Sequence, residues 1–130
     1  MHPRVQTDYY KNHPRMDAFD LAVRESRNPV FYNGDLFSRD DIRNFRNQYP
    51  GVEAVMLGRG LLTNPSLTEE TPFTAERIRA FHEDVLEGYR RAIPGDKNVL
   101  FKMKELWTYL GEAFEDSTKL MKKIRKAQKM

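Results

Sequence analysis

The fold is decided by two similar stretches, Pro29-Val30-Phe31-Tyr32-Asn33-Gly34-Asp35 and Val52-Glu53-Ala54-Val55-Met56-Leu57-Gly58-Arg59-Gly60. Each is a short apolar run that ends in a glycine-containing polar turn, which is typical of a buried strand followed by a loop. Between them, residues 38–49 have the apolar spacing of a helix, and Ser38 with Asp41 forms the pattern of a capping box. The order strand, helix, strand predicts two neighbouring parallel strands.

Both glycine turns follow the carboxyl ends of their strands, so we expect them to lie side by side. In a (β/α)8 barrel, the loops after the seventh and eighth strands bind phosphate at this place. Gly34, Gly58 and Gly60 allow backbone N–H groups to approach an anion, and Arg59 adds positive charge. The two turns therefore predict an anion site. The alternatives are a plain structural turn at Asn33-Gly34 and an ion pair between Arg59 and a carboxylate.

Composition restricts the class of protein. The chain has 130 residues, of which 39% are hydrophobic and 32% charged, as in a globular protein. Its apolar runs fall far short of the ~20 residues that span a membrane, and its start has no hydrophobic signal sequence. It contains no cysteine, which excludes disulfides and thiolate metal sites, and its histidines have no ligand-spaced partners. We expect a cytoplasmic protein without membrane or metal partners.

The second half of the chain has a polar linker followed by helical patterns only. A polar linker at residues 68–72 predicts two domains, 1–67 and 68–130. Three amphipathic patterns follow it, with Thr74 and Asp96 as caps of the first two, and predict a small antiparallel helical bundle. The fold class is therefore α/β plus all-α, mostly helical overall, with two βα units before the bundle. Two such units cannot close a barrel, so we expect a C-terminal barrel fragment that can self-associate through exposed sheet edges.

Positive charge is concentrated at the end of the chain. The formal net charge is only +3, but residues 117–130 contain six Lys or Arg residues and no acidic residue. This asymmetry favours an anionic partner such as RNA, and a solvated helix face is the alternative.

Four stretches, in this order, resemble motifs of the tRNA-dihydrouridine synthases, flavoenzymes that reduce uridine in tRNA. They are His2-Pro3-Arg4 followed by Tyr9 or Tyr10, Pro29 to Asp35 with its Asn-Gly-Asp turn, Val55 to Gly60 followed by Asn64-Pro65, and Lys102 to Leu110 with its basic-Trp-Tyr pattern. The ordered set covers nearly the whole chain, whereas a single Gly-Arg-Gly turn would be a weak signal.

The resemblance implies an enzyme that uses FMN and NADPH to form 5,6-dihydrouridine in tRNA. Residues 1–67 would supply the flavin-phosphate end of a TIM barrel, and residues 68–130 a helical tRNA-binding domain. The positions that match flavin-binding positions are His2, Asn33, Gly34, Asp35, Gly58 and Arg59. Arg4 matches a position near the flavin and the substrate base. The residues expected to contact tRNA as a group are Lys102, Lys104, Lys119, Lys122, Lys123, Arg125 and Lys126.

The chain departs from the family in one respect. The family's catalytic cysteine, and a lysine on an earlier barrel strand, have no counterpart here. We therefore expect a C-terminal fragment that does not catalyse the reaction by itself. The alternative function is a non-catalytic RNA-binding helical module with a vestigial barrel remnant. Another phosphate-binding barrel is a third interpretation, against which the basic Trp-Tyr helix argues.

Overall fold

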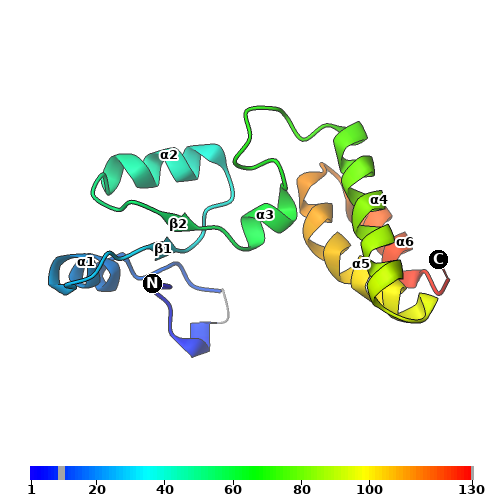
Figure 1. Cartoon of the computed structure of the whole chain (residues 1–130), viewed down its shortest axis with the longest axis horizontal. Coiled ribbons are helices and arrows are strands. Elements are labelled where there is room, and N and C mark those ends of the chain that lie inside the picture. Colours follow the sequence, from blue (N-terminus) through cyan, green and yellow to red (C-terminus); the bar gives the residue numbers. More distant parts are fainter. Residues whose placement is uncertain (9–10, 130) are drawn as a thin grey trace. The chain divides into compact units, whose positions relative to one another are not determined.

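A computed structural model describes residues 1–8 and 11–129 of the chain. The described part is mostly helical and contains a small parallel sheet of two strands (Figure 1). Two compact units, Met1–Leu61 and Leu62–Met130, make up the chain. Tyr9 and Tyr10, which belong to the first matched motif, lie outside the described residues.

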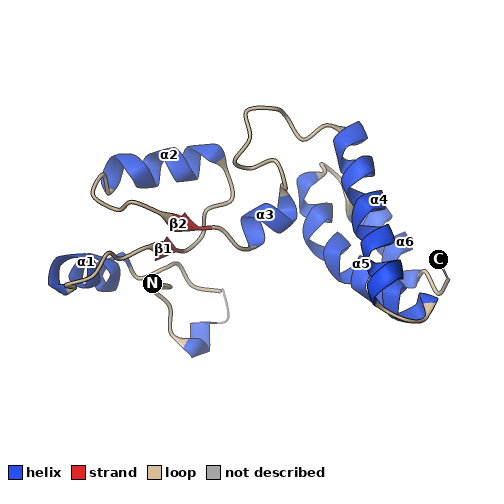
Figure 2. Cartoon of the chain, viewed as in Figure 1, coloured by secondary structure: helices blue, strands red, loops and turns tan. Residues whose placement is uncertain are grey.

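Helices and strands alternate in the first unit, and only helices follow in the second (Figure 2). The elements of the first unit are η1 (Gln6–Asp8), α1 (Met16–Glu25), β1 (Tyr32–Asn33), α2 (Arg39–Gln48), β2 (Val55–Met56) and the start of α3 (Arg59–Thr63). Those of the second are α4 (Ala75–Ala92), α5 (Asp96–Leu110), η2 (Gly111–Ala113) and α6 (Thr118–Lys126). The division falls between residues 61 and 62, whereas the polar linker at residues 68–72 suggested a boundary after residue 67.

Strands β1 and β2 are parallel neighbours, which confirms the strand-helix-strand interpretation. Tyr32 is in register with Val55, and Asn33 with Met56. On the other side of β1, the N–H of Asn33 donates to the carbonyl of Met1 at 2.8 Å. The N-terminal segment and the ends of both strands are therefore held close together.

Helix α2 has the capping box that the sequence predicts. The Ser38 hydroxyl accepts a hydrogen bond from the Asp41 N–H at 3.0 Å, and the Asp41 carboxylate accepts one from the Ser38 N–H at 2.8 Å. Burial raises the pKa of Asp41, but hydrogen bonds from Ser38 and from the Phe37 N–H outweigh it and leave that pKa below its usual value.

Aromatic rings form the core of the first unit. Phe19 on α1, Tyr32 on β1 and Phe45 on α2 are buried, together with Leu36. The rings of Tyr32 and Phe45 stack at 4.2 Å between centroids, and Phe19 meets Tyr32 edge-on at 5.0 Å. This packing fixes β1 and the polar turn that follows it.

The second unit is built on α5, which packs against both α4 and α6. Its buried apolar residues are Leu67, Ile78, Val99, Leu100, Met103, Leu110 and Met121. The expectation that Asp96 caps α5 is wrong, because Gly95 occupies the N-cap with φ of 88° and Asp96 is the first helical residue. No helix in the described part of the chain is long and apolar enough to cross a membrane.

Candidate anion-binding site

A cavity of about 160 Å³ lies at the carboxyl ends of β1 and β2, within the first unit. It is lined by His2, Arg4, Asn33, Gly34, Phe37, Gly58, Arg59 and Gly60. At ~30 Å³ for each water molecule, this volume has room for a phosphate group. It is smaller than the ~300–1,000 Å³ of pockets that hold a whole drug-sized ligand. The cavity thus suits one anionic end of a larger molecule.

The carboxylate of Asp35 links two arginines beside this cavity. Its Oδ1 accepts from Arg4 Nη1 at 3.0 Å and from Arg59 Nη2 at 2.8 Å, and its Oδ2 accepts from Arg4 Nη2. Exposed fractions of the three side chains are 4% for Arg4, 26% for Asp35 and 32% for Arg59. Two guanidinium groups against one carboxylate leave a positive site.

Arg4 is the most deeply placed of these three residues. Besides Asp35, its guanidinium donates from Nε and Nη2 to the Asn12 carbonyl, at 3.0 and 2.7 Å, and from Nη1 to His2 Nε2 at 3.3 Å. The hydrogen bond to Asp35 and the charge of that carboxylate hold the pKa of Arg4 above its usual value, although burial opposes this. The structure thus uses all five N–H donors of Arg4 within the protein.

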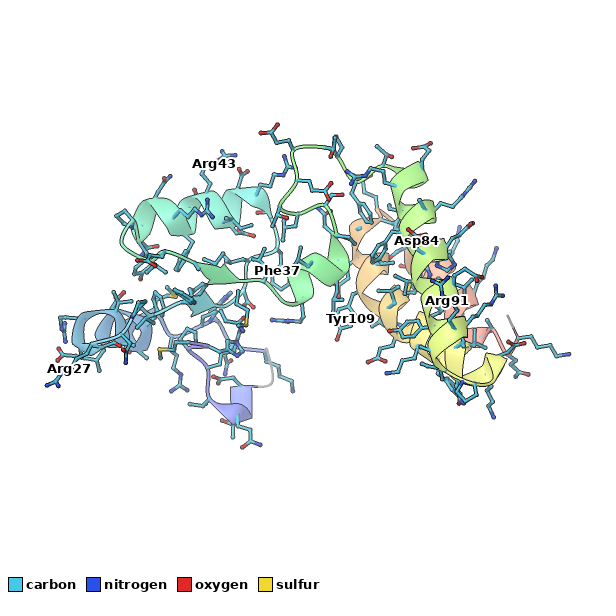
Figure 3. All side chains as sticks on the ribbon, viewed as in Figure 1. Arg27, Phe37, Arg43, Asp84, Arg91 and Tyr109 are labelled. Atoms are coloured by element: carbon cyan, nitrogen blue, oxygen red, sulfur yellow. The ribbon has the colours of Figure 1, made fainter. Side chains whose placement is uncertain are left out.

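Arg59 lies closer to solvent and covers an aromatic ring. Its guanidinium carbon is 5.2 Å from the centre of the Phe37 ring, which is within cation–π range. Figure 3 labels Phe37 beside the ribbon at the start of α3. The ring and the Asp35 carboxylate therefore constrain Arg59 from two sides.

The two strand-end turns differ in the space around their glycines. A Cβ at residue 34 would lie 1.9 Å from the hydroxyl oxygen of Tyr32, a side chain held in place by Phe45. A Cβ at residue 58 would meet no atom within 4 Å. Gly34 is thus required by the packing of Tyr32, whereas the backbone at Gly58 is open to a ligand.

The donor set fits the phosphate end of a flavin nucleotide. Fixed positive charge, accessible backbone beside Gly58 and a cavity of suitable volume are the features that phosphate groups require. The six sequence-matched flavin positions are close together: five of them line the cavity and the sixth, Asp35, is bonded to the two lining arginines. Within the described residues no cluster of three or more His, Asp or Glu side chains could hold a metal ion.

The basic residues of the second unit fall into two groups. Lys102 pairs with Glu105 at 3.0 Å, and Lys104 donates to the carbonyl of Arg125 at 2.9 Å, so both have partners on the protein. The other group, which we call the α6 basic face, consists of exposed side chains for which the described residues provide no hydrogen bond or ion pair. Its members are Lys119, Lys122, Lys123, Arg125 and Lys126.

The apolar side of α6 differs in part from expectation. Met121 is buried, and Ile124 and Ala127 are half-buried, as an inward face requires. Leu120, which was expected to face inward, is 38% exposed, because the helix has only nine residues and buries a narrow stripe around Met121.

Sequence analysis missed two residues at the anion site, Phe37 and Asn12. In the sequence, Phe37 is an ordinary apolar residue before a helix. Its functional position comes from the contact of its ring with Arg59, which is distant in sequence. Asn12 contributes its backbone carbonyl to Arg4, for which a sequence carries no signal. The Arg4–Asp35 pair could have been suspected from its opposite charges within two matched motifs.

Comparison with known proteins gives a match to one protein family over the whole chain. The model of the dihydrouridine synthase family matches residues 1–130. A protein of Shewanella oneidensis described as tRNA-dihydrouridine(16) synthase is 28% identical over 134 residues, which cover 96% of this chain and 41% of that protein. Proteins of Aquipseudomonas alcaligenes and Pseudomonas putida with the same description are 33% and 34% identical over 70 and 67 residues, or 54% and 52% of this chain. These matches cover 22% and 20% of the two proteins, so the chain spans less than half the length of its relatives.

Proposed function

Because the chain belongs to the dihydrouridine synthase family, we propose that it is part of an FMN-dependent enzyme that reduces uridine to 5,6-dihydrouridine in tRNA with NADPH. One observation carries the proposal: the residues from three separate motifs, at His2, Asn33-Gly34 and Gly58-Arg59, line a single cavity. Their convergence supports a flavin-phosphate site at the carboxyl ends of the last two strands of a TIM barrel.

In this proposal the first unit holds the phosphate end of FMN. Arg59 supplies a guanidinium for the phosphate oxygens, and the open backbone at Gly58 allows close approach. Once bound there and reduced by NADPH, the flavin would provide the hydride for C6 of the uracil ring. Holding the phosphate restricts where the flavin can lie, which is a positioning contribution to catalysis.

The second unit, in the same proposal, binds tRNA. A uracil must leave its stack to reach a flavin, so the enzyme has to hold the surrounding tRNA firmly. The α6 basic face provides five cationic side chains for phosphate contacts. Lys102 and Lys104 would contribute less, because Glu105 and the Arg125 carbonyl already engage them.

The experiment compares two flavins that differ only in the phosphate group. FMN and riboflavin are titrated into the full chain, and binding is followed by flavin fluorescence. We expect weak binding of FMN and no detectable binding of riboflavin, because the cavity accommodates only the phosphate end. Arg59→Ala should abolish FMN binding, whereas Arg43→Ala, on the outer side of α2 in Figure 3, should leave it unchanged. Equal binding of the two flavins would refute the phosphate site.

The second candidate function is an RNA-binding module without chemistry. The α6 basic face favours it, because five exposed cationic side chains can contact RNA phosphates whether or not a flavin is bound. Both functions predict that the 130-residue chain, incubated with FMN, NADPH and unmodified tRNA, forms no dihydrouridine detectable by mass spectrometry. They differ in flavin binding, which the module lacks. Formation of dihydrouridine would contradict both expectations.

A further inference from the structure

We infer that Arg4 is a positioning residue, which orients Arg59 through Asp35 and fixes the tautomer of His2. The inference deepens the proposed function and rests on it, because all these residues belong to the same phosphate site. It gives Arg4 a role in holding neighbouring residues, whereas the family resemblance implied only a position near the flavin and the substrate base.

The donor geometry of Arg4 supports this role. Its five N–H groups are directed at three acceptors: the Asn12 carbonyl, the His2 ring and the Asp35 carboxylate. The side chain is only 4% exposed. A guanidinium whose donors are all engaged, and which is almost wholly covered, is suited to hold its neighbours in place rather than to meet a substrate.

The first consequence concerns Arg59. Oδ1 of Asp35 accepts from Arg4 and Arg59 at once, while Oδ2 accepts from Arg4 Nη2. The bidentate contact with Arg4 therefore fixes the plane of the Asp35 carboxylate. The carboxylate in turn fixes the position of Arg59 Nη2. Without Arg4, Asp35 could rotate toward Arg59 or away from it.

The second consequence concerns His2. A guanidinium can only donate, so the bond from Arg4 Nη1 requires His2 Nε2 to accept. The proton of the neutral ring must then be on Nδ1. Arg4 thus makes His2, which lines the cavity, an Nδ1–H donor, which is the form able to donate to an anion from that nitrogen.

The test is nuclear magnetic resonance on the full chain labelled with 15N, at a pH near 8, where an imidazole is ordinarily neutral. Long-range 15N spectra report which ring nitrogen of His2 carries the proton. The side-chain Nε–H signal of Arg59 reports whether its guanidinium is held in one environment. Neither signal requires flavin or activity.

Two variants separate the two consequences. Arg4→Met removes every donor, so His2 should lose the Nδ1–H preference and the Arg59 signal should broaden or move to the position of free arginine. Asp35→Asn keeps the contact between Arg4 and His2, so only the Arg59 signal should change. Arg15→Met is the matched control, because Arg15 belongs to the same N-terminal region but pairs with Asp8 at 3.8 Å.

Inorganic phosphate distinguishes this inference from the proposed function. Phosphate should shift the Arg59 signal of the wild type. Arg4→Met should weaken phosphate binding by about tenfold, the loss expected when a displaced Arg59 no longer makes one charge-assisted hydrogen bond to the anion. If phosphate has no effect but the tautomer and Arg59 signals respond as described, the phosphate site is wrong and the positioning role stands.

The positioning role is refuted if wild-type His2 carries its proton on Nε2, or if the Arg59 signal is the same in wild type and Asp35→Asn. These two results remain decisive even if Arg4→Met does not fold, because neither depends on that variant.

Discussion

Trp107 on α5 donates its indole N–H to Nδ1 of His82 on α4, with 3.0 Å between the two nitrogens. The two rings also border a cavity of about 370 Å³ in the second unit, together with Phe114, which stacks on Trp107 at 6.0 Å. Because the indole only donates, Nδ1 of His82 must be unprotonated for this bond to exist. The pair therefore links the packing of two helices to the protonation of one histidine.

Protonation of His82 should be visible through Trp107, the only tryptophan in the sequence. Burial lowers the pKa of His82 below its ordinary value of 6.5, and the charge of Glu83 only partly opposes this. A histidine whose pKa is lowered by folding contributes stability to the folded state at pH values above its unfolded pKa. This contribution is lost as the pH falls through the lowered pKa of the folded state. Tryptophan fluorescence should thus change with a midpoint below pH 6.5. His82→Gln should remove the transition, and a midpoint above 6.5 would contradict the burial.

The helical unit should fold by itself. Residues 62–130 contain their own core around Leu67, Val99 and Leu110, each no more than 1% exposed. A protein of this segment should give a helical circular-dichroism spectrum and a cooperative thermal transition. Trp107→Ala should cost about 2–3 kcal/mol, below the usual range for a fully buried tryptophan, because the ring is half-buried. A broad, non-cooperative thermal transition would show that residues 62–130 need the rest of the chain in order to fold.

Tyr49 should titrate at unusually high pH. Its hydroxyl donates to Asp20 at 2.6 Å, and burial together with that carboxylate raises its pKa to about 12. A raised tyrosine pKa favours the neutral phenol, so its contribution to stability is complete below about pH 10 and is lost as the pH rises toward 12. Ultraviolet titration should show one tyrosine ionising near pH 12, and Tyr49→Phe should remove that step. Persistence of the step in this variant would assign it to another tyrosine.

The local parts of the fold could be predicted from sequence. Helix α2 begins where the Ser38–Asp41 capping box places it, because a cap and its helix are neighbours in the chain. The parallel pairing of β1 and β2 also follows from local order, although hydrogen bonding limits each strand to two residues. Gly95 displaced Asp96 as the cap of α5, since a turn that needs positive φ favours glycine.

The candidate site was less accessible to sequence reasoning. Its matched residues could be identified as motifs, but the motifs did not indicate how Arg4, Asp35 and Arg59 interact. These contacts join residues 31 and 24 positions apart, and they depend on how the aromatic core orients β1. Assignment of the two units to flavin binding and tRNA binding, and self-association through the sheet edges, stay predictions.

The tRNA-binding role of the α6 basic face is tested most directly by gel shifts of the full chain with tRNA at several salt concentrations. The triple variant Lys122→Glu, Lys123→Glu and Lys126→Glu reverses three exposed charges without touching buried Met121. The matched control reverses Arg24, in the last turn of α1, and Arg27, which follows that helix and is labelled in Figure 3.

We predict that wild-type affinity falls steeply with salt, and that the triple variant binds much more weakly, with a salt dependence flatter by up to about three units. The control variant should bind nearly as the wild type does, and both variants should keep the wild-type circular-dichroism spectrum. If the triple variant binds tRNA like the wild type at low and moderate salt, the α6 basic face is only a solvated surface, and the tRNA-binding role proposed for it is wrong.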